Sequence, residues 1–274
     1  MPKPKIVVHC LVKNEERFVW YALKSVLPFV DKVMVWDTGS TDNTVRLIKS
    51  INSKKIKLKI LKSVDAVQHT NLRQQMLNQT NKEFSWLMIL DGDEIWPKSQ
   101  IKKMADYLKH TKDKAIVVKT RNLVGDIYHQ LPESAGKYEI AGFKGHLGLR
   151  FISLDLPSLK IKNPHGGQTY TTKNTPLQKL EIGLRVLPNI YYFHVTHLER
   201  STKDKDTLKR SFKRKFEIGE KVNKKDLPKL FFDKRPTFVP DVTQSMSKSF
   251  FLTSLIQTPL RKVKRTIFPS KSGY

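Results

Sequence analysis

The sequence predicts an α/β fold, in which a mostly parallel central sheet flanked by helices precedes a basic, mainly helical C-terminal extension. Two observations lead to this prediction. Along residues 1–199, short apolar runs alternate with amphipathic segments, and many runs end in turns rich in Gly, Ser, Thr, Asn and Asp, which is typical of βα units. Residues 200–274 hold 20 basic and 7 acidic residues, against 31 and 18 in residues 1–199. We therefore expect a domain over 1–199 and an extension over 200–274.

The first two βα units are the clearest. Residues 6–12 form an apolar run that predicts a buried strand, and Asn14 is the candidate cap of the helix that follows. Apolar side chains continue at helical spacing to Val26, and Pro28 ends the helix. A strand at 33–36 repeats the design. The remaining expected elements are helices through residues 45–51, 71–77 and 99–108 and strands at 58–61, 86–90, 115–119, 149–154 and 190–194.

Other stretches show less regular patterns. Residues 125–148 are rich in Gly, Tyr and His and predict a long active-site loop, and residues 155–189 predict another loop. We expect a basic, polar helix over 200–225, followed by a proline-containing linker. In 246–268 apolar residues recur at helical spacing, but Pro259 favours two short helices over one.

The strand at 86–90 leads straight into an acidic turn that contains Asp91, Gly92 and Asp93. In open α/β sheets, ligands bind just outside the carboxyl ends of the strands. Hard cations take oxygen ligands, and Mg²⁺ in particular is often held by one or two carboxylates together with substrate phosphates. The sequence therefore predicts a platform for Mg²⁺ or Mn²⁺ and phosphate at Asp91 and Asp93. The alternative is an acidic turn that merely ends a core strand.

The net charge of +26 favours anionic partners: nucleic acid, an acidic membrane surface or a phosphorylated substrate. Cys10 is the single cysteine, so no internal disulfide can form, and its apolar surroundings predict a buried thiol. No segment has the roughly 18 apolar residues that a transmembrane helix needs, and the N-terminus is too short and polar for a signal peptide. We expect a cytoplasmic protein.

Three motifs in order resemble the family 2 glycosyltransferases of the GT-A fold. A strand leads to Asn14 and Glu15, a second strand ends in Asp37 followed by a Gly-Ser-Thr-Asp-x-Thr turn, and the Asp-x-Asp motif stands at 91–93. The residue sequences of these motifs are most similar to those of the branch that includes lipopolysaccharide core glucosyltransferases. The resemblance implies a GT-A (Rossmann-like) sheet and an inverting, metal-dependent transfer of a sugar from a nucleoside-diphosphate sugar to a saccharide or lipid-linked acceptor, in cell-surface polysaccharide or lipopolysaccharide synthesis.

The resemblance also implies roles for individual residues. Asp37 would accept hydrogen bonds from the base or ribose, although it could instead form an Asx turn. Arg73 would face the nucleotide, although it could instead be a solvated position on a helix. Asp91 would meet the ribose or the metal, and Asp93 would hold the metal that bridges the diphosphate oxygens. The nucleotide-sugar site would comprise Val12, Asn14, Glu15, Asp37, Arg73, Asp91 and Gly92.

The catalytic base has no clear counterpart. Near Arg150 the sequence lacks the upstream acid and the downstream His-Glu pair that the branch carries. Glu139, His146 and His165 are the candidates, and each could instead satisfy a local hydrogen bond. His194 and His197, at the end of the last expected strand, are further candidates to approach the metal.

The extension ends in a basic amphipathic segment whose apolar positions run from Leu252 to Ile267. Such a segment suits an anionic membrane surface, where each basic residue adds about 1 kcal/mol, so the protein would be peripheral on the inner face of the cell membrane. The alternative is that this stripe packs on the catalytic domain or is partly disordered.

Two other functions compete with glycosyl transfer. A nucleic-acid-binding protein would explain the charge, but the paired carboxylates would repel phosphates and no nucleic-acid motif is present, so we expect no nucleic-acid partner. A phosphohydrolase would use Asp91 as nucleophile and Asp93 as acid. Such enzymes usually carry this pair after the first strand, whereas here several βα units come first.

Overall fold

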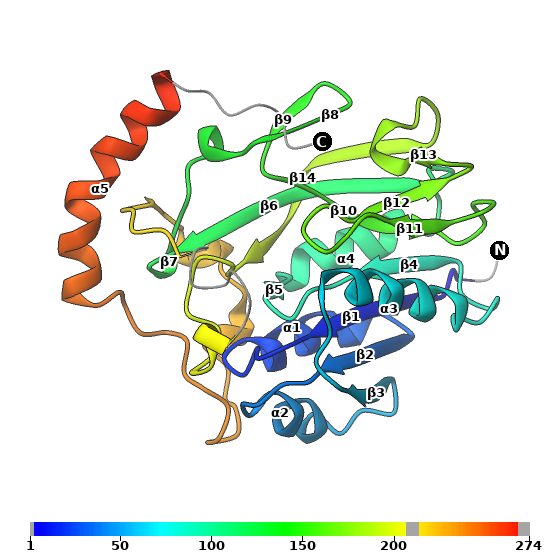
Figure 1. Ribbon diagram of the computed structural model, residues 1–274, viewed down its shortest axis with the longest axis horizontal. Helices are drawn as coiled ribbons and strands as arrows, with labels where there is room; N and C mark the ends of the chain where they lie inside the picture. Colours follow the sequence, from blue (N-terminus) through cyan, green and yellow to red (C-terminus); the bar gives the residue numbers. More distant parts are fainter. Residues whose placement is uncertain (1–2, 207–213, 268–274) are drawn as a thin grey trace.

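The computed structural model describes residues 3–206 and 214–267 (Figure 1). Its α-helices are α1 (Val19–Val26), α2 (Thr44–Ser50), α3 (Ala66–Asn78), α4 (Lys98–Tyr107) and α5 (Lys248–Ile267). Its strands are β1 (Ile6–Val12), β2 (Lys32–Thr38), β3 (Ile56–Leu61), β4 (Trp86–Ile89), β5 (Glu94–Ile95), β6 (Ala115–Val124), β7 (Asp126–Gln130), β8 (Tyr138–Ile140), β9 (Phe143–Gly145), β10 (Leu147–Ser153), β11 (Lys160–Lys162), β12 (Thr169–Thr172), β13 (Thr175–Pro176), β14 (Leu184–His194) and β15 (Glu220–Lys221).

The central sheet has the order β15-β7-β6-β10-β4-β1-β2-β3, and β14 pairs with both β6 and β5. Strands β1 to β4 run parallel, as the βα pattern predicts. β10 is antiparallel to both of its neighbours, β4 and β6, so β6 again runs in the direction of β4. β14 is parallel to β6. The α/β fold is therefore confirmed, with a mixed sheet: β1 to β4 form its parallel part, and β5, β7, β10 and β15 pair antiparallel to their neighbours.

Two layers cover the sheet. Alternate side chains of β1 point to opposite faces, so Val8 and Cys10 join the core under α1, α2 and α4, while Val7 and Leu11 join the core under α3 and the small sheet β11-β12-β13. Every residue of β1 is buried. The thiol of Cys10 is fully buried, as its apolar neighbours predict.

The central position of β1 sets the place of the candidate site. β1 lies between β2 and β4, and all three run in one direction, so the loops that follow them meet at one rim of the sheet. Those loops hold residues 13–16, 39–43 and 90–93. The strands themselves are nearly all apolar, and the polar motifs gather where the strands end.

Two stretches that predict loops contain strands instead. Residues 125–148 hold β7, β8 and β9, and residues 155–189 hold β11, β12 and β13. These strands are two to five residues long, too short for a continuous apolar run or a clear alternation. β14 also begins six residues earlier than predicted, because Pro188 interrupts the pattern where the structure has a register shift between Leu187 and Tyr191.

The extension differs from the prediction as well. Over 200–225 the described residues contain no α-helix, only short 3₁₀ turns and β15, and residues 207–213 of this range lie outside the description. α5 is one helix of 20 residues with Pro259 inside it, where we predicted two short helices, and Phe268 lies outside the described residues. Pro259 is exposed, so water can bond the carbonyl that loses its donor.

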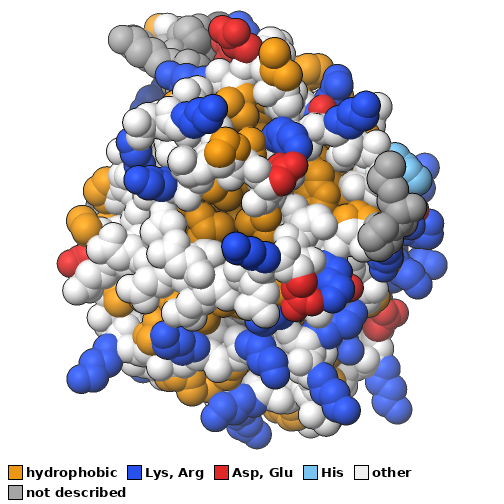
Figure 2. Space-filling model, turned by 90° about the vertical axis from the view of Figure 1, so that its right-hand side faces the viewer, with side chains coloured by type: hydrophobic (Ala, Val, Ile, Leu, Met, Phe, Trp, Pro, Cys, Tyr) orange, Lys and Arg blue, Asp and Glu red, His pale blue; other side chains and the backbone are white. Residues whose placement is uncertain are grey.

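The surface of the molecule is basic. Figure 2 shows the right-hand side of Figure 1, where Lys and Arg side chains are spread over the face with few Asp and Glu between them. This agrees with the net charge of +26. Within the described part of the chain, no helix has the length and apolarity that crossing a membrane requires.

The segment that follows β14 is tied to the first loops of the chain through Glu16. Glu16 Oε1 accepts hydrogen bonds from the backbone N–H and the hydroxyl of Thr202, both at 2.8 Å. Its Oε2 accepts from the backbone and side-chain N–H groups of Asn43 at 3.1 and 3.0 Å. Burial raises the pKa of Glu16, but these four donors outweigh burial and lower the pKa to about 2.

We predict that Glu16→Gln lowers the free energy of unfolding at pH 7 by roughly 1–3 kcal/mol, because the charged acceptor of four hydrogen bonds is lost. A carboxyl with a depressed folded pKa stabilises the fold above its unfolded pKa, and this contribution disappears as the pH falls through the folded value. The gap between wild type and variant should therefore narrow from about pH 4.5 downward. Urea titrations between pH 7 and pH 3 measure it. Glu181→Gln, at an exposed position, is the control, and a gap that does not change with pH would contradict the assignment.

Candidate functional site

Eight predicted site residues are linked by direct contacts at the rim where β1, β2 and β4 end. Val12 lies beside Asp37 in the β1–β2 register, and the hydroxyl of Thr38 donates to the Val12 carbonyl at 3.0 Å. The others are joined to this pair through the loops described below. The set is Val12, Asn14, Glu15, Asp37, Arg73, Asp91, Gly92 and Asp93.

Asn14 joins two loops and does not cap a helix, which corrects the prediction. α1 begins only at Val19, and Asn14 has a left-handed backbone with φ 53°, which Asn tolerates better than most residues. Its side-chain oxygen accepts from the Thr41 backbone N–H at 2.8 Å, and its own backbone N–H donates to Ser40 Oγ at 2.8 Å. The loop after β1 and the loop after β2 therefore hold each other in place.

Asp37 closes the turn after β2. Its carboxylate accepts from the backbone N–H groups of Gly39 (3.2 Å) and Ser40 (3.0 Å) and from the Ser40 hydroxyl. Gly39 has φ +81°, and a Cβ there would lie 2.7 Å from the Ser63 backbone nitrogen, so only glycine fits. The Asx turn is thus present, and Asp37 is 1% exposed.

Gly92 allows the acidic turn to pack on the loop after β1. A Cβ at this position would lie 2.9 Å from the Cγ atom of Glu15 and 3.0 Å from a methyl carbon of Val12. Real Cβ atoms essentially never come that close, so a side chain at residue 92 would push the turn away from β1. The glycine between the two aspartates therefore brings both carboxylates close to Glu15.

Arg73 forms an ion pair with Asp91. Arg73 Nη2 lies 2.5 Å from Asp91 Oδ1, and the arginine is only 5% exposed, so it does not occupy a solvated helix surface. Burial raises the pKa of Asp91, but the guanidinium groups of Arg73 and Arg150 outweigh burial and lower the pKa to about 2. Asp91 is therefore ionised at neutral pH, and its side chain keeps about a third of its surface exposed.

Asp93 lies deeper, at the centre of a cluster of charged groups. It is 2% exposed, and its Oδ2 atom contacts both Nη1 of Arg200 and Nε2 of His194, the latter at 3.1 Å. The same Arg200 nitrogen lies 3.1 Å from Glu15 Oε1. Burial lowers the pKa of His194, but the Asp93 carboxylate outweighs burial and leaves the pKa above its ordinary value.

Glu94 forms a second buried pair next to this cluster. It is fully buried and bonded to Arg150 Nη2, and its other oxygen accepts the Asp91 backbone N–H at 3.2 Å. Burial raises the pKa of Glu94 to about 7 against the opposing charge of Arg150. The guanidinium of Arg150 also lies 4.9 Å from the ring centre of Tyr192 on β14, so the pair connects the acidic turn to β10 and β14.

The three candidate bases lie elsewhere. Glu139, on β8, forms a 3.4 Å ion pair with Lys144. His146 is 8% exposed, and its two ring nitrogens contact the Asn122 amide at 2.7 Å and the Pro132 carbonyl at 3.1 Å. Both of these side chains thus have local partners that explain their positions.

His165 lies against α3. Its backbone N–H donates to the Ala66 carbonyl, and its ring centre is 4.1 Å from that of His69. Burial, together with the charges of Arg73 and His165, lowers the pKa of His69 to about 3. The pair of histidines therefore lies within the electrostatic influence of Arg73, on the α3 side of the site.

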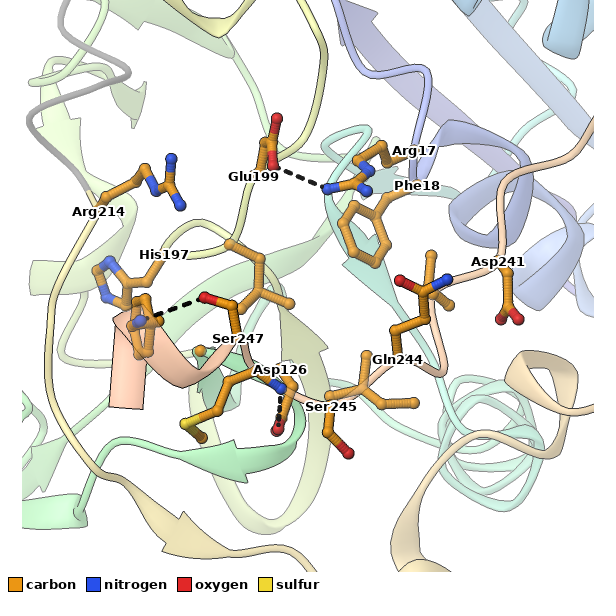
Figure 3. A pocket seen from close by; sticks show the side chains of 16 residues that line it. Arg17, Phe18, Asp126, His197, Glu199, Arg214, Asp241, Gln244, Ser245 and Ser247 are labelled. Atoms are coloured by element: carbon orange, nitrogen blue, oxygen red, sulfur yellow. Dashed lines mark hydrogen bonds and ion pairs between the residues drawn. The ribbon is translucent and has the colours of Figure 1, made fainter. Parts of the chain in front are cut away.

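The two histidines after β14 have different surroundings. His194 contacts Asp93, whereas His197 lines a cavity of about 190 Å³ together with Leu198 and Glu199. Figure 3 shows Arg17 paired with Glu199 on one wall of this cavity and residues of the extension, Gln244 to Ser247, on another. None of the eight site residues at the rim, all of which lie in the described part of the chain, lines this cavity.

Three residues of the cluster have no assigned role in the sequence-based site, namely Glu94, Arg150 and Arg200, whereas His194 is a candidate to approach the metal and contacts Asp93. Glu94 directly follows the motif and could have been included on adjacency alone. Arg150 and Arg200 lie 56 and 107 positions from their carboxylate partners. Only the ladder of the sheet, which pairs His194 with Glu94, brings the end of β14 to the acidic turn.

Solved structures with a similar fold include a bacterial protein of known ligand. The fragment 1–349 of S. aureus TarS, in complex with UDP-GlcNAc, is 17% identical, with 70% of this chain and 58% of that chain covered and a TM-score of 0.51. A longer TarS structure gives 16% identity, 70% and 36% coverage and a TM-score of 0.48. The chain thus spans from about a third to three fifths of the TarS chains, and this likeness supports the fold alone.

A further similar structure is glucosyl-3-phosphoglycerate synthase from Mycobacterium tuberculosis, in complex with Mn²⁺, UDP-glucose and phosphoglyceric acid. It is 16% identical, with 76% of each chain covered and a TM-score of 0.47. No curated protein matches the sequence.

The family comparison is decisive. The model described as Glycosyl transferase family 2 matches residues 8–159, which is more than half of the chain. The match includes the Asn14–Glu15 pair, the turn at 37–44 and the acidic turn at 91–93, the three motifs whose loops meet at the rim of the sheet. The chain therefore belongs to glycosyl transferase family 2 and has its GT-A fold.

Proposed function

We propose that the protein transfers a sugar from a nucleoside-diphosphate sugar to a saccharide or lipid-linked acceptor, with inversion at the anomeric carbon and with the aid of Mg²⁺ or Mn²⁺. The observation that carries this proposal is the meeting of Asp91, Asp93 and His194 with Arg73 at the carboxyl rim of β1, β2 and β4. UDP-GlcNAc is bound by the TarS fragment, whose fold is similar. Family membership favours this function over nucleic-acid binding and phosphate-ester hydrolysis.

The side chains at Asp93 fit a divalent cation. Within the described ranges no group of three or more His, Cys, Asp or Glu side chains is arranged to hold a metal. Asp93 Oδ2 and His194 Nε2 nevertheless lie 3.1 Å apart, and a carboxylate with an imidazole suits Mn²⁺, while Mg²⁺ often uses one or two carboxylates plus substrate phosphates. A cation bound by these residues and Asp91 would neutralise charge on the departing diphosphate.

The side chains of the rim would orient the donor. Asp91 is ionised and partly exposed, which makes it a suitable acceptor for ribose hydroxyls. Arg73 is held by Asp91 through Nη2, and its Nε and Nη1 atoms are buried, so the guanidinium would act on the anionic donor through its charge. Asp37, Asn14 and Val12 shape the loops on which the base would rest. Of the candidate bases we retain His165, because its ring lies 4.1 Å from that of His69, on the Arg73 side of the site.

We predict that Asp93→Asn lowers turnover of the preferred nucleotide sugar by at least about 100-fold, since a fixed charge beside the reacting groups is lost. A donor-hydrolysis screen across nucleotide sugars with Mn²⁺ identifies the donor and supplies the assay. The matched control is Asp106→Asn, which removes a surface carboxylate paired with Lys102 and Lys109 and should retain full activity. Thermal melting checks that both variants fold. Full activity of Asp93→Asn would exclude Asp93 from the site.

We also propose that the extension, residues 200–274, holds the enzyme at an anionic membrane, consistent with a lipid-linked acceptor and a role in cell-envelope polysaccharide or lipopolysaccharide synthesis. α5 lies at the edge of the molecule beyond β7 (Figure 1). Its inner side is covered: Phe250, 7% exposed, packs with Val124 and Leu131, while the Thr258 hydroxyl accepts the Ile218 N–H and Arg265 pairs with Glu217, both within the extension. Its apolar stripe faces away from the body.

That outward stripe consists of large apolar side chains that are 48–70% exposed: Leu252, Leu255, Ile256, Leu260, Val263 and Ile267. The stripe therefore does not pack on the catalytic domain, which was the alternative expectation. Lys262 and Lys264 are exposed beside it. An apolar helical stripe flanked by cations is suited to lie in the interface of an anionic bilayer.

We predict that Ile256→Glu and Leu260→Glu each weaken binding to vesicles of phosphatidylcholine and phosphatidylglycerol by about tenfold or more, because each removes a side chain worth about 1.5–3 kcal/mol when buried. Vesicle co-sedimentation measures this, and binding should also weaken with salt. Ile182→Glu, at a position that is 90% exposed and far from α5 in sequence, is the control. Unchanged binding, or a concentration-dependent dimer that the substitutions abolish, would instead assign the stripe to a second protein chain.

A further inference from the structure

The guanidinium of Arg200 lies inside the cluster of carboxylates at the rim. Arg200 is 7% exposed and follows β14 by six residues. Its Nη1 atom contacts Asp93 Oδ2 and lies 3.1 Å from Glu15 Oε1. Burial alone would lower the pKa of Arg200, but Asp93 and Glu15 outweigh burial and raise it. The side chain is therefore a fixed positive charge between two buried carboxylates.

The buried acids of the cluster each have an arginine partner. Arg73 pairs with Asp91, and Arg150 pairs with Glu94. Arg200 serves the remaining two, Asp93 and Glu15. Carboxylates without a counter-charge are costly to bury, and removing one partner of such a pair is strongly destabilising. The fold thus neutralises its acidic turn with charges of its own.

The contact of Arg200 falls on the oxygen that a metal would need. Asp93 Oδ2 faces both the Arg200 nitrogen and His194 Nε2. A cation held by Asp93 and His194 would take the same oxygen, and its charge would repel the guanidinium. The cation and the Arg200 guanidinium would therefore compete for the Oδ2 atom of Asp93.

Arg200 also lies in a segment that is fastened by hydrogen bonds. Its carbonyl accepts the Arg17 backbone N–H at 3.0 Å, and its backbone N–H donates to Asp204 Oδ2 at 3.0 Å. Ser201 and Thr202 bond to the carboxylates of Asp42 and Glu16. The backbone at residue 200 is thus anchored, so the side chain can move while the segment stays in place.

We infer that Arg200 is a resident counter-ion of the metal site: it neutralises Asp93 and Glu15 until a divalent cation binds, and then gives up the Asp93 oxygen to that cation. The inference rests on the metal site proposed above. It makes Arg200 a positioning residue that sets metal affinity and ties metal occupancy to the segment after β14. The apparent affinity of the site for a cation is then its intrinsic affinity multiplied by the fraction of molecules in which Arg200 has left the Asp93 oxygen.

The test is a titration of the full-length protein with Mn²⁺, followed by electron paramagnetic resonance of the free ion, without any nucleotide. Arg200→Ala should bind Mn²⁺ at least about tenfold more tightly than wild type, because the competing charge is gone. Without metal the variant should melt at a lower temperature than wild type, since two buried carboxylates lose their contact with Arg200. Adding Mn²⁺ should raise the melting temperature of the variant by more than it raises that of the wild type. Unchanged or weaker Mn²⁺ binding by Arg200→Ala would overturn the inference.

The matched control is Arg17→Ala. Arg17 belongs to the same group of loops, but its side chain is exposed and pairs with Glu199 at 3.1 Å, so its loss should leave Mn²⁺ affinity unchanged. If Arg200→Ala fails to fold, Arg200→Gln takes its place, because it keeps a polar side chain without the charge; it should also bind Mn²⁺ more tightly than wild type, and unchanged or weaker binding would overturn the inference. The Mn²⁺ titration needs no sugar donor. If Arg200→Ala binds Mn²⁺ more tightly but the wild type turns over no nucleotide sugar, the proposed transfer reaction is rejected and the inference on Arg200 stands.

Discussion

The pairing of buried carboxylates with arginines at one rim of the sheet is the constraint on which the rest of this structure depends. Asp91, Asp93 and Glu94 follow the end of β4 within five positions, and three guanidinium groups neutralise them. The arginines come from α3, from β10 and from the segment after β14. No single element could supply all three in the right directions, so the acidic turn requires the sheet, the helix layer and the end of β14 to be assembled together.

The same constraint explains why β10 runs against its neighbours. Arg150 is in the middle of β10, between β4 and β6, and points to Glu94 just past the end of β4. An antiparallel strand enters the sheet from the rim where β4 ends, so Arg150, which directly precedes the Phe151–Met88 pair, is placed beside the end of β4 and the acidic turn. The irregular register between Leu149 and Phe151 falls at Arg150 and re-aims its side chain, as bulges next to functional sites often do.

The sequence predicts the fold correctly where the spacing of apolar residues in a segment matches the way that segment is buried in the folded protein. Strand β1 and the units through α4 have continuous apolar runs and helical periodicity, and the structure has them at nearly the expected positions. The short strands of 125–189 have no such pattern, because each is only two to five residues long and pairs with a strand next to it in the chain. For the site, the carboxylates and Arg73 lie in motifs that sequence can identify. His194 is indicated by its place at the end of the last expected strand. Arg150 and Arg200 could not be found in this way, because ion pairs 56 and 107 positions apart leave no local spacing to detect.

The place of β10 between β4 and β6 also matters while the chain is being made. β4 ends at residue 89, and its neighbour on that side begins only at residue 147. At roughly 5–20 residues per second, a ribosome needs about 3–12 s to deliver the missing strand. During that interval the apolar edge of β4 is open to any other extended segment. The nascent chain therefore has a stage at which a bound chaperone or fast elongation would protect it from joining a wrong neighbour.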